Sequence, residues 1–146
     1  MVCCAPEVAP ALAGADLILH AGDIDTLEVL EQLRALAPVI AVRGNNDRGA
    51  WAEAILEREV TRVGSVCIYM LHDLHDIDLS PGAAGFQVVV SGHTHRPLIE
   101  QRDSVLFVNP GSAGPRRFSL PVTVGRLMIE GPAVRAEVVH LIPARS

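Results

Sequence analysis

The chain has 146 residues, 49% of them hydrophobic, and a net charge of −5, so it is long enough to bury the core of a folded domain and too apolar to be disordered. The acidic balance argues against a surface that coats nucleic acid, which needs a basic face. Three cysteines without metal or disulfide spacing indicate a cytoplasmic protein, and no apolar run is as long as a membrane span. We expect one domain over residues 1–146.

The first third of the chain alternates helices and strands. A short helix is predicted over residues 7–14 and a strand over residues 16–20. An amphipathic helix follows, opened by Asp25 as its N-cap and ended by Pro38. Because a second strand over residues 39–42 comes directly after it, the two strands are expected to be parallel. The apolar face of the helix consists of Leu27, Val29, Leu30, Leu33 and Leu36.

The rest of the chain is mostly strand-like. Residues 51–56 suit one helical turn, and residues 59–63 and 65–71 suit a hairpin around Gly64. Residues 77–84 suit a short helix or a loop, and residues 86–90 a buried strand. Further strands are predicted over residues 105–108, 122–129 and 133–141. An α/β first half with an antiparallel second half predicts two sheets packed face to face.

Four of the apolar strands end in compact polar clusters. One such ending is ordinary turn chemistry, and two histidines on a turn can be surface residues. Four endings that supply a carboxylate, an amide oxygen and imidazoles fit a metal site at the carboxyl edge of a sheet. Nitrogen and oxygen ligands without thiolate suit Mn, Fe, Zn or Co and disfavour Ca or Mg. The clusters are His20-Ala21-Gly22-Asp23, Gly44-Asn45-Asn46-Asp47, His72-Asp73 and Gly92-His93-Thr94-His95.

The order of these clusters, followed by Asn109-Pro110-Gly111-Ser112, resembles the calcineurin-like metallophosphoesterase superfamily. In size and in that last motif the chain is similar to the small bacterial YfcE-type phosphodiesterases. The resemblance implies an α/β, four-layer sandwich of two mixed β-sheets flanked by helices, with a two-metal centre at one edge. It implies hydrolysis of a small phosphodiester by a metal-bound hydroxide. Mn²⁺ is the expected ion, with Zn²⁺, Fe²⁺ or Ni²⁺ as alternatives.

The resemblance also implies the ligands of each metal. Asp23 is expected to bridge both ions. Asn45, His72 and His93 would complete the shell of the second ion, and His95 would belong to the first. In the family the first ion is also held by an Asp-x-His motif at the end of an initial strand, which has no counterpart here. We therefore expect about one ion per chain and an impaired first site.

Catalytic roles are implied for Asn45, Asn46 and Asp47. Many relatives carry histidine where this chain has Asn46, which cannot donate a proton to a leaving group near neutral pH. This departure is typical of the small diesterases rather than of the protein phosphatases. Arg116 or Arg117 is expected to contact substrate oxygens.

Supporting roles are implied for two further residues. Asn109 and the turn that follows it are expected to buttress the histidine loop. Asp73 stands where glycine is usual in the family. It either supports the ligands or is a solvated loop carboxylate.

The start of the chain suggests why the first motif has no counterpart. Met1-Val2-Cys3-Cys4-Ala5 is what the family's metal loop would give if it were translated one base late, with the frame restored at Pro6-Glu7. A divergent N-terminus and a truncation are the alternatives. Without its first strand the sheet would have an unpaired parallel edge, which favours pairing with a second copy as a homodimer.

Two rival functions remain open at this point. One is a catalytically silent interaction module, like the retromer scaffold subunit that shares this fold, and the incomplete first metal site favours it. The retained ligands argue against it. The other is a hydrolase of the metallo-β-lactamase type, which also uses His-x-His but expects Asp-His shortly after, where this chain has Arg96-Pro97.

Overall fold

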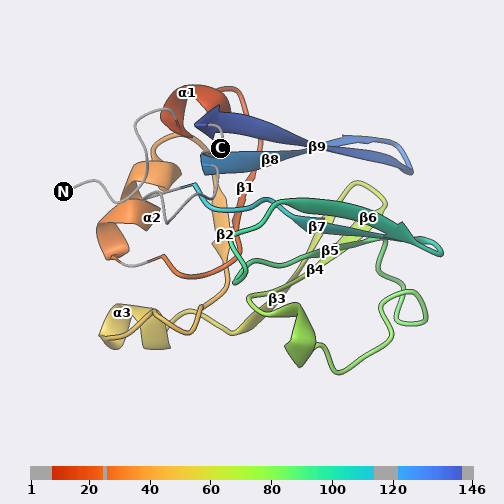
Figure 1. Ribbon diagram of the computed structural model, residues 1–146, viewed down its shortest axis with the longest axis horizontal. Coiled ribbons are helices and arrows are strands. Elements are labelled where there is room, and N and C mark those ends of the chain that lie inside the picture. The colour runs from red at the N-terminus through yellow and green to blue at the C-terminus, as the bar shows by residue number, and fades with distance from the viewer. Residues whose placement is uncertain (1–7, 25, 114–121, 143–146) are drawn as a thin grey trace.

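The computed structural model describes residues 8–24, 26–113 and 122–142 (Figure 1). Its helices are α1 (Val8–Leu12), α2 (Leu27–Arg34), α3 (Ala50–Glu53) and the 3-10 helix η1 (Leu74–Asp76). Its strands are β1 (Ile18–His20), β2 (Val39–Ala41), β3 (Arg58–Val63), β4 (Val66–Leu71), β5 (Val88–Val90), β6 (Leu98–Arg102), β7 (Val105–Asn109), β8 (Val122–Glu130) and β9 (Ala133–Ile142).

The largest sheet has five strands in the order β3-β4-β5-β7-β6. Its three central strands β4, β5 and β7 are parallel, and the edge strands β3 and β6 are antiparallel to their neighbours. The central strand β5 is buried on both faces, with Val88 and Val89 fully covered. A continuous valine run is what a buried parallel strand requires.

Two separate pairs of strands cover one face of this sheet. β1 and β2 form a parallel pair across α2, as predicted, and β8 and β9 form a long antiparallel hairpin. Leu19 and Ile40 from the first pair and Leu127 and Ile129 from the second pack against the same core of the large sheet. The structure is therefore a sandwich of mixed sheets, as expected. Among the described residues, its first layer is the five-stranded sheet and its second layer consists of these two pairs of strands.

The outer layers differ from each other. The three α-helices lie together on one side of the molecule (Figure 1), where α2 buries Val29, Leu30 and Leu33 against the outer face of β1 and β2. The far face of the large sheet is covered by η1 and the loop after it, through side chains such as Leu74 and Phe86. The segment 77–84 is a loop with turns, which was one of the two predicted alternatives.

Three local predictions were wrong. The N-cap position of α2 is Thr26 rather than Asp25, because the helix begins at Leu27. Leu27 is 40% exposed, and Leu36, which is 39% exposed, lies beyond the end of α2 at Arg34, so the apolar face of α2 is narrower than predicted. β6 was not predicted. It is an edge strand whose side chains are exposed or half-buried, so it lacks the apolar pattern of a core strand.

Some expectations concern parts of the chain that the structure does not describe. The segment Met1-Val2-Cys3-Cys4-Ala5 lies outside the described residues, so the origin of the N-terminus and the missing first strand stay predictions. The single domain and the homodimer stay predictions as well. Within the described ranges, no helix is long and apolar enough to cross a membrane.

Candidate metal centre

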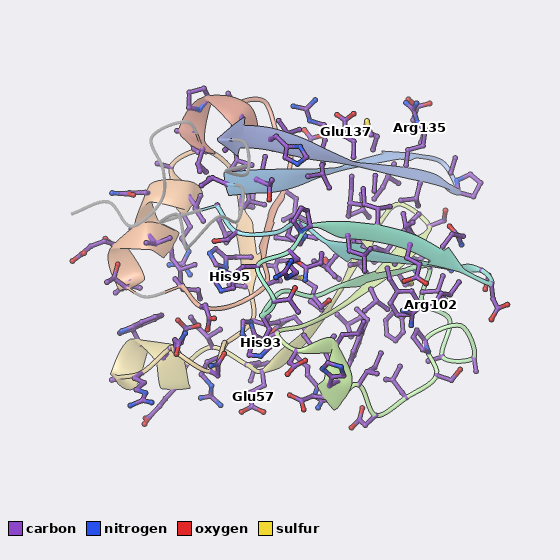
Figure 2. All side chains as sticks on the ribbon, viewed as in Figure 1. Glu57, His93, His95, Arg102, Arg135 and Glu137 are labelled. Atoms are coloured by element: carbon purple, nitrogen blue, oxygen red, sulfur yellow. The ribbon has the colours of Figure 1, made fainter. Side chains whose placement is uncertain are left out.

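The predicted clusters meet at the carboxyl ends of β1, β2, β4 and β5. The structure brings Asp23, Asn45, His72, His93 and His95 into contact with one another. His93 and His95 lie in the loop that leaves β5, at the end of the large sheet nearest the helices (Figure 2). Parallel strands carry their carboxyl ends to the same edge of a sheet, which is why motifs far apart in sequence converge here.

The two loops after β1 and β2 approach each other so closely that glycine is required in both. A Cβ added to Gly22 would lie 2.5 Å from His72 Nδ1 and 2.9 Å from the backbone of Gly44. A Cβ added to Gly44 would collide with the backbone nitrogen and Oδ1 of Asp23. Gly22 also has a φ of +100°, which favours glycine. The glycines therefore allow the carboxylate and the amide to reach the same point.

Three of the predicted ligands have strained backbones. Asp23, His93 and His95 have φ values of 54°, 71° and 61°. In the described part of the chain, only one other non-glycine residue, Asp103, has a positive φ. Strain of this kind costs about 1–3 kcal/mol per residue and concentrates at functional sites. The positions that the sequence assigned to metal binding are thus held in conformations that the surrounding loops impose.

His72 is the centre of the cluster. Its Nδ1 donates to the carbonyl oxygen of Ala21 at 2.7 Å, since a carbonyl can only accept. Its Nε2 points at three electron-pair donors. These are Asn45 Oδ1 at 2.9 Å, His93 Nδ1 at 3.3 Å and Asp23 Oδ2 at 3.4 Å. These three atoms and His72 Nε2 itself all carry electron pairs. At such short separations they need a proton or a cation between them.

The spacing of these atoms fits a transition metal. Ligands about 2.1 Å from an ion lie about 3.0 Å apart at right angles and about 3.4 Å apart at tetrahedral angles. The measured separations run from 2.9 to 3.4 Å, and His93 Nδ1 lies 3.3 Å from Asn45 Oδ1. His, Cys, Asp and Glu side chains alone form no group of three that could hold an ion among the described residues. The proposed set therefore includes the amide oxygen of Asn45, which lies 2.9 Å from His72 Nε2.

The electrostatics of the cluster suit the binding of a cation. Burial raises the pKa of Asp23, but hydrogen bonds from His72 and from the backbone of Asn46, together with the nearby imidazoles, lower it to about 2. Burial lowers the pKa of His72, but its hydrogen bonds with Asp23 and Ala21 and the charge of Asp23 outweigh this and raise it. An ionised carboxylate thus faces a histidine whose positively charged form it stabilises.

Asn46 and Asp47 form hydrogen bonds with the loops that carry the predicted ligands. The backbone N–H of Asn46 donates to Asp23 Oδ1 at 3.1 Å, and its side-chain amide donates to Oδ2 at 3.4 Å. The buried carboxylate of Asp47 accepts from the backbone N–H groups of Ile24 and Gly44, at 2.7 and 2.8 Å. In this structure both residues orient Asp23 and its loop, and a direct catalytic role for either stays a prediction.

Asn109 has the contacts expected of a residue that supports the histidine loop. Its side-chain amide donates to Gly92 O at 3.0 Å and to Thr94 Oγ1 at 3.1 Å, and its Oδ1 accepts from Gly111 N–H at 3.0 Å. The loop that carries both histidines is thus tied to the end of β7.

Asp73 lies on the other side of the histidine loop. Its Oδ2 lies 3.8 Å from His93 Nε2, and its Oδ1 accepts from the backbone N–H of His75. The carboxylate is 26% exposed, so it is neither a freely solvated group nor a buried one. This position lets it orient the His93 ring so that Nδ1 faces Asn45 and His72.

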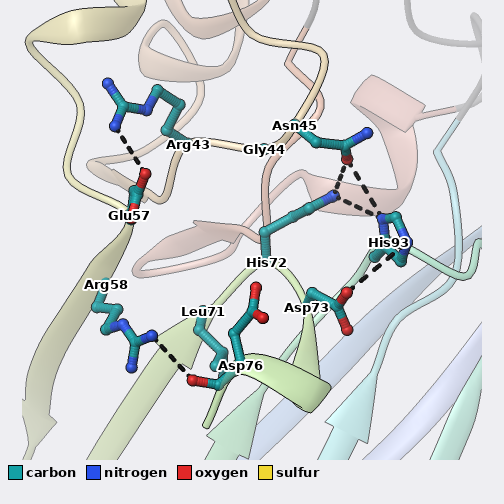
Figure 3. A pocket seen from close by; sticks show the side chains of 10 residues that line it. All are labelled: Arg43, Gly44, Asn45, Glu57, Arg58, Leu71, His72, Asp73, Asp76 and His93. Atoms are coloured by element: carbon teal, nitrogen blue, oxygen red, sulfur yellow. Dashed lines mark hydrogen bonds and ion pairs between the residues drawn. The ribbon is translucent and has the colours of Figure 1, made fainter. Parts of the chain in front are cut away.

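The site for a first ion is less complete. His95 Nε2 lies 3.9 Å from Asp23 Oδ2, and these are the two predicted ligands of that ion. Arg116 and Arg117, the predicted substrate contacts, lie outside the described residues. Two described arginines, Arg43 and Arg58, line a cleft of about 190 Å³ together with Asn45, His72 and His93 (Figure 3).

Sequence reasoning missed these two arginines. Arg43 directly precedes Gly44-Asn45, and this adjacency was a usable signal, because a residue next to a ligand loop lies close to the site. Arg58 begins β3 and has no sequence signal of its own. It reaches the cleft because β3 pairs with β4, which carries His72 at its end.

Residues 3–131 match the family model of the calcineurin-like phosphoesterase superfamily domain. The chain belongs to this superfamily. It is 36% identical over 142 residues to a protein described as a probable metallophosphoesterase from Methanothermobacter thermautotrophicus, with 92% of this chain and 82% of that protein covered. It is 31% identical over 114 residues to the phosphodiesterase YfcE of Escherichia coli K12, with 68% of this chain and 58% of YfcE covered. Divalent metal use is a property of metallophosphoesterases as a group.

A solved structure confirms the fold. A single mutant of Vps29 from Entamoeba histolytica aligns with a TM-score of 0.75, over 97% of this chain and 92% of that one, at 22% sequence identity. At this level of identity the likeness concerns the fold alone. The family match confirms the predicted superfamily, and this likeness confirms its α/β sandwich fold.

Proposed function

We propose that this protein is a metal-dependent phosphodiesterase that hydrolyses a small phosphodiester. The observation that carries the proposal is the close approach of two oxygen atoms and one nitrogen atom to His72 Nε2. Asn45 Oδ1, His93 Nδ1 and Asp23 Oδ2 all lie within 3.4 Å of His72 Nε2. Membership of a phosphoesterase superfamily and the likeness to YfcE support the same activity.

The residues of the chain have distinct tasks in this proposal. A divalent ion, when bound, supplies a Lewis acid that neutralises charge on the phosphoryl group and lowers the pKa of water. Asp23, Asn45, His72 and His93 hold it, with the His72 ring fixed by its bond to the Ala21 carbonyl. Asn46 orients Asp23 and has no proton to give to a leaving group near neutral pH. Esters with good leaving groups should therefore react fastest.

We propose one ion per chain, with Mn²⁺ as the preferred metal. The donors are two imidazoles, an amide oxygen and a carboxylate, a set that suits Mn²⁺, Zn²⁺, Fe²⁺ and Ni²⁺ better than Ca²⁺. We also propose a cytoplasmic location. The free thiol of Cys67 supports it, because such thiols persist in reducing compartments.

The activity is tested with bis(p-nitrophenyl) phosphate and Mn²⁺. We expect Asn45→Ala and His93→Ala to lower kcat/KM at least about 100-fold, since each removes a donor atom and not merely its support. His140→Ala is the matched control, because it removes an exposed histidine of β9 that is not in the cluster. Equal activity in all four proteins would show that hydrolysis does not depend on this site.

A silent scaffold is the second candidate, favoured by the incomplete site for a first ion, of whose predicted ligands Asp23 and His95 lie 3.9 Å apart. It needs no convergent donors and no strained ligand loops. Hydrolysis that responds to the two ligand variants but not to the control would exclude it. Tight metal binding without hydrolysis of any phosphodiester would favour it.

A further inference from the structure

The cleft beside the donor cluster has a chemistry of its own. Asn45, His72 and His93 form one wall, and Arg43 and Arg58 approach from the opposite side (Figure 3). A phosphoryl group held at the donor cluster would therefore extend one of its ester groups into this space.

The far wall presents donors and acceptors together. Arg43 Nη2 lies 2.9 Å from Glu57 Oε1, and the Glu57 side chain is 70% exposed. Arg58 is held at three points, because Nη1 donates to Tyr69 Oη at 3.1 Å and to Asp78 Oδ1 at 3.0 Å, and Nη2 donates to Asp76 O at 2.8 Å. The guanidinium group of Arg58 is thus held in place, that of Arg43 is paired with Glu57, and acceptor oxygens lie beside both.

The side chains that line the cleft are mainly polar or charged. The described residues there include no Phe, Tyr or Trp, and the rings present are the imidazoles of His72 and His93, which are proposed metal ligands. A nucleobase would therefore find no ring to stack on besides those of the donor cluster. An acyl chain would find little apolar side chain to cover, because Leu71 is 2% exposed.

The volume of the cleft limits the size of the group that it can bind. A volume of about 190 Å³ equals about six water molecules at about 30 Å³ each. Pockets for drug-sized ligands begin at about 300 Å³. The cleft therefore has room for a glycerol unit or a single sugar.

We propose that this cleft binds the alcohol part of the substrate and that this alcohol is a short polyol, either glycerol or a single sugar. Its hydroxyl groups accept from Arg43 and Arg58 and donate to Glu57. The inference rests on the proposed phosphodiesterase activity. In the reaction, the oxygen of water bonds to phosphorus, one P–O ester bond breaks, and the departing alcohol leaves as its anion or takes up the proton that water releases.

The test compares p-nitrophenyl phosphodiesters that have the same charge and differ in the second alcohol. In the test compounds the second alcohol is glycerol, or glucose esterified at its 6-hydroxyl. In the reference compound it is propanol, which has the three carbons of glycerol without its other hydroxyls. We expect kcat/KM for at least one polyol ester to exceed that of the propyl ester at least tenfold, mainly through KM. Tenfold corresponds to 1.4 kcal/mol, which is about one or two net hydrogen bonds. The ratio between the glyceryl and glucosyl esters identifies which polyol fits.

Variants locate the preference in the cleft. Glu57→Gln and Arg58→Gln should each reduce it to less than about threefold, because each removes a charged hydrogen-bonding partner. Arg62→Gln is the matched control, since Arg62 is a second arginine of β3 that binds Gly64 O outside the cleft. It should keep the full preference. A thermal melt of each variant shows whether it has folded.

The outcomes separate the two proposals. Equal rates on polyol and propyl esters, with bis(p-nitrophenyl) phosphate still hydrolysed, would overturn the polyol subsite and leave the phosphodiesterase standing. A preference for a p-nitrophenyl ester of thymidine 5′-phosphate over both polyols would overturn it in favour of a nucleotide. No hydrolysis of any ester would overturn the activity, and the subsite with it.

Discussion

Replacement of Gly44 by alanine tests how closely the two ligand loops approach. The added Cβ would collide with the backbone nitrogen and Oδ1 of Asp23 and lie 3.0 Å from the carbonyl carbon of Gly22. Backbone atoms cannot rotate away, so the loops must separate. Separation would break a bond that Asp47 accepts, at 2.8 Å from Gly44 N–H or at 2.7 Å from Ile24 N–H.

The loss of stability that Gly44→Ala should cause can be calculated from these contacts. Overpacking costs about 1–3 kcal/mol, and a lost hydrogen bond to a charged group costs about 1.5–3 kcal/mol. We expect Gly44→Ala to lower the free energy of unfolding by about 3 kcal/mol, which for a chain of this size lowers Tm by roughly 6–12 °C. Because Asp23 and Asn45 move apart, Mn²⁺ affinity should fall at least about tenfold, as for loss of a support of a metal ligand.

Calorimetry supplies both numbers, with thermal unfolding for stability and titration for Mn²⁺ affinity. Gly82→Ala is the matched control, because a Cβ there meets Val105 and Ser104 at ordinary contact distances of 3.5 and 3.6 Å. It should leave both quantities unchanged or raise stability slightly. A Gly44→Ala protein with the Tm and Mn²⁺ affinity of the unmodified chain would refute the close approach of the loops.

Two further predictions concern the supports and the protonation of the site. Asn109→Ala should lower the free energy of unfolding by about 1–3 kcal/mol, because it leaves half-buried partners such as Gly92 O unsatisfied. It should also weaken Mn²⁺ binding at least about tenfold. Denaturant unfolding and titration calorimetry measure both, and an unchanged affinity would contradict the buttress. Mn²⁺ affinity should fall as the pH is lowered from about 8 to about 5, the range in which histidine titrates. His72, whose pKa is raised in the ion-free protein, must lose its Nε2 proton before it can bind an ion. The titration should release protons on binding, and an affinity independent of pH would exclude His72 as a ligand.

Much of the fold is predictable because local pattern and tertiary packing agree. The β1–α2–β2 unit and the β3–β4 hairpin follow from apolar runs separated by a helix or by Gly64. β6 is not predictable in this way, because Leu98 and Ile99 are 52% and 36% exposed and the strand is held mainly by its pairing with β7. Edge strands owe their conformation to a neighbour rather than to their own pattern.

In the candidate site, the ligands are predictable from the sequence but not every residue that positions them. That four strand ends meet at one edge follows from the resemblance and from parallel pairing, and the structure brings all five predicted ligands together. The support that Asn109 gives to the histidine loop was expected from the same resemblance. The positioning role of Asp47 was not, because nothing in sequence shows that its oxygens face Ile24 and Gly44 rather than the cleft.

The arginines show where sequence reasoning stops. Substrate contacts were assigned to Arg116 or Arg117 from the family resemblance, and these residues lie outside the described part of the chain. Arg58 enters the cleft through strand pairing and through contacts with Tyr69 and Asp78. Such contacts depend on side-chain packing between segments that are separated in sequence, and no periodicity reports them.

The central claim is that Asp23, Asn45, His72 and His93 hold one divalent ion. Equilibrium dialysis against Mn²⁺, followed by elemental analysis, measures the ion content of each chain directly. The account predicts about one tightly held ion per chain, lost in Asn45→Ala and His93→Ala and kept in His140→Ala. An unmodified protein that holds no ion, or ligand variants that hold it as tightly as the control, would contradict the account.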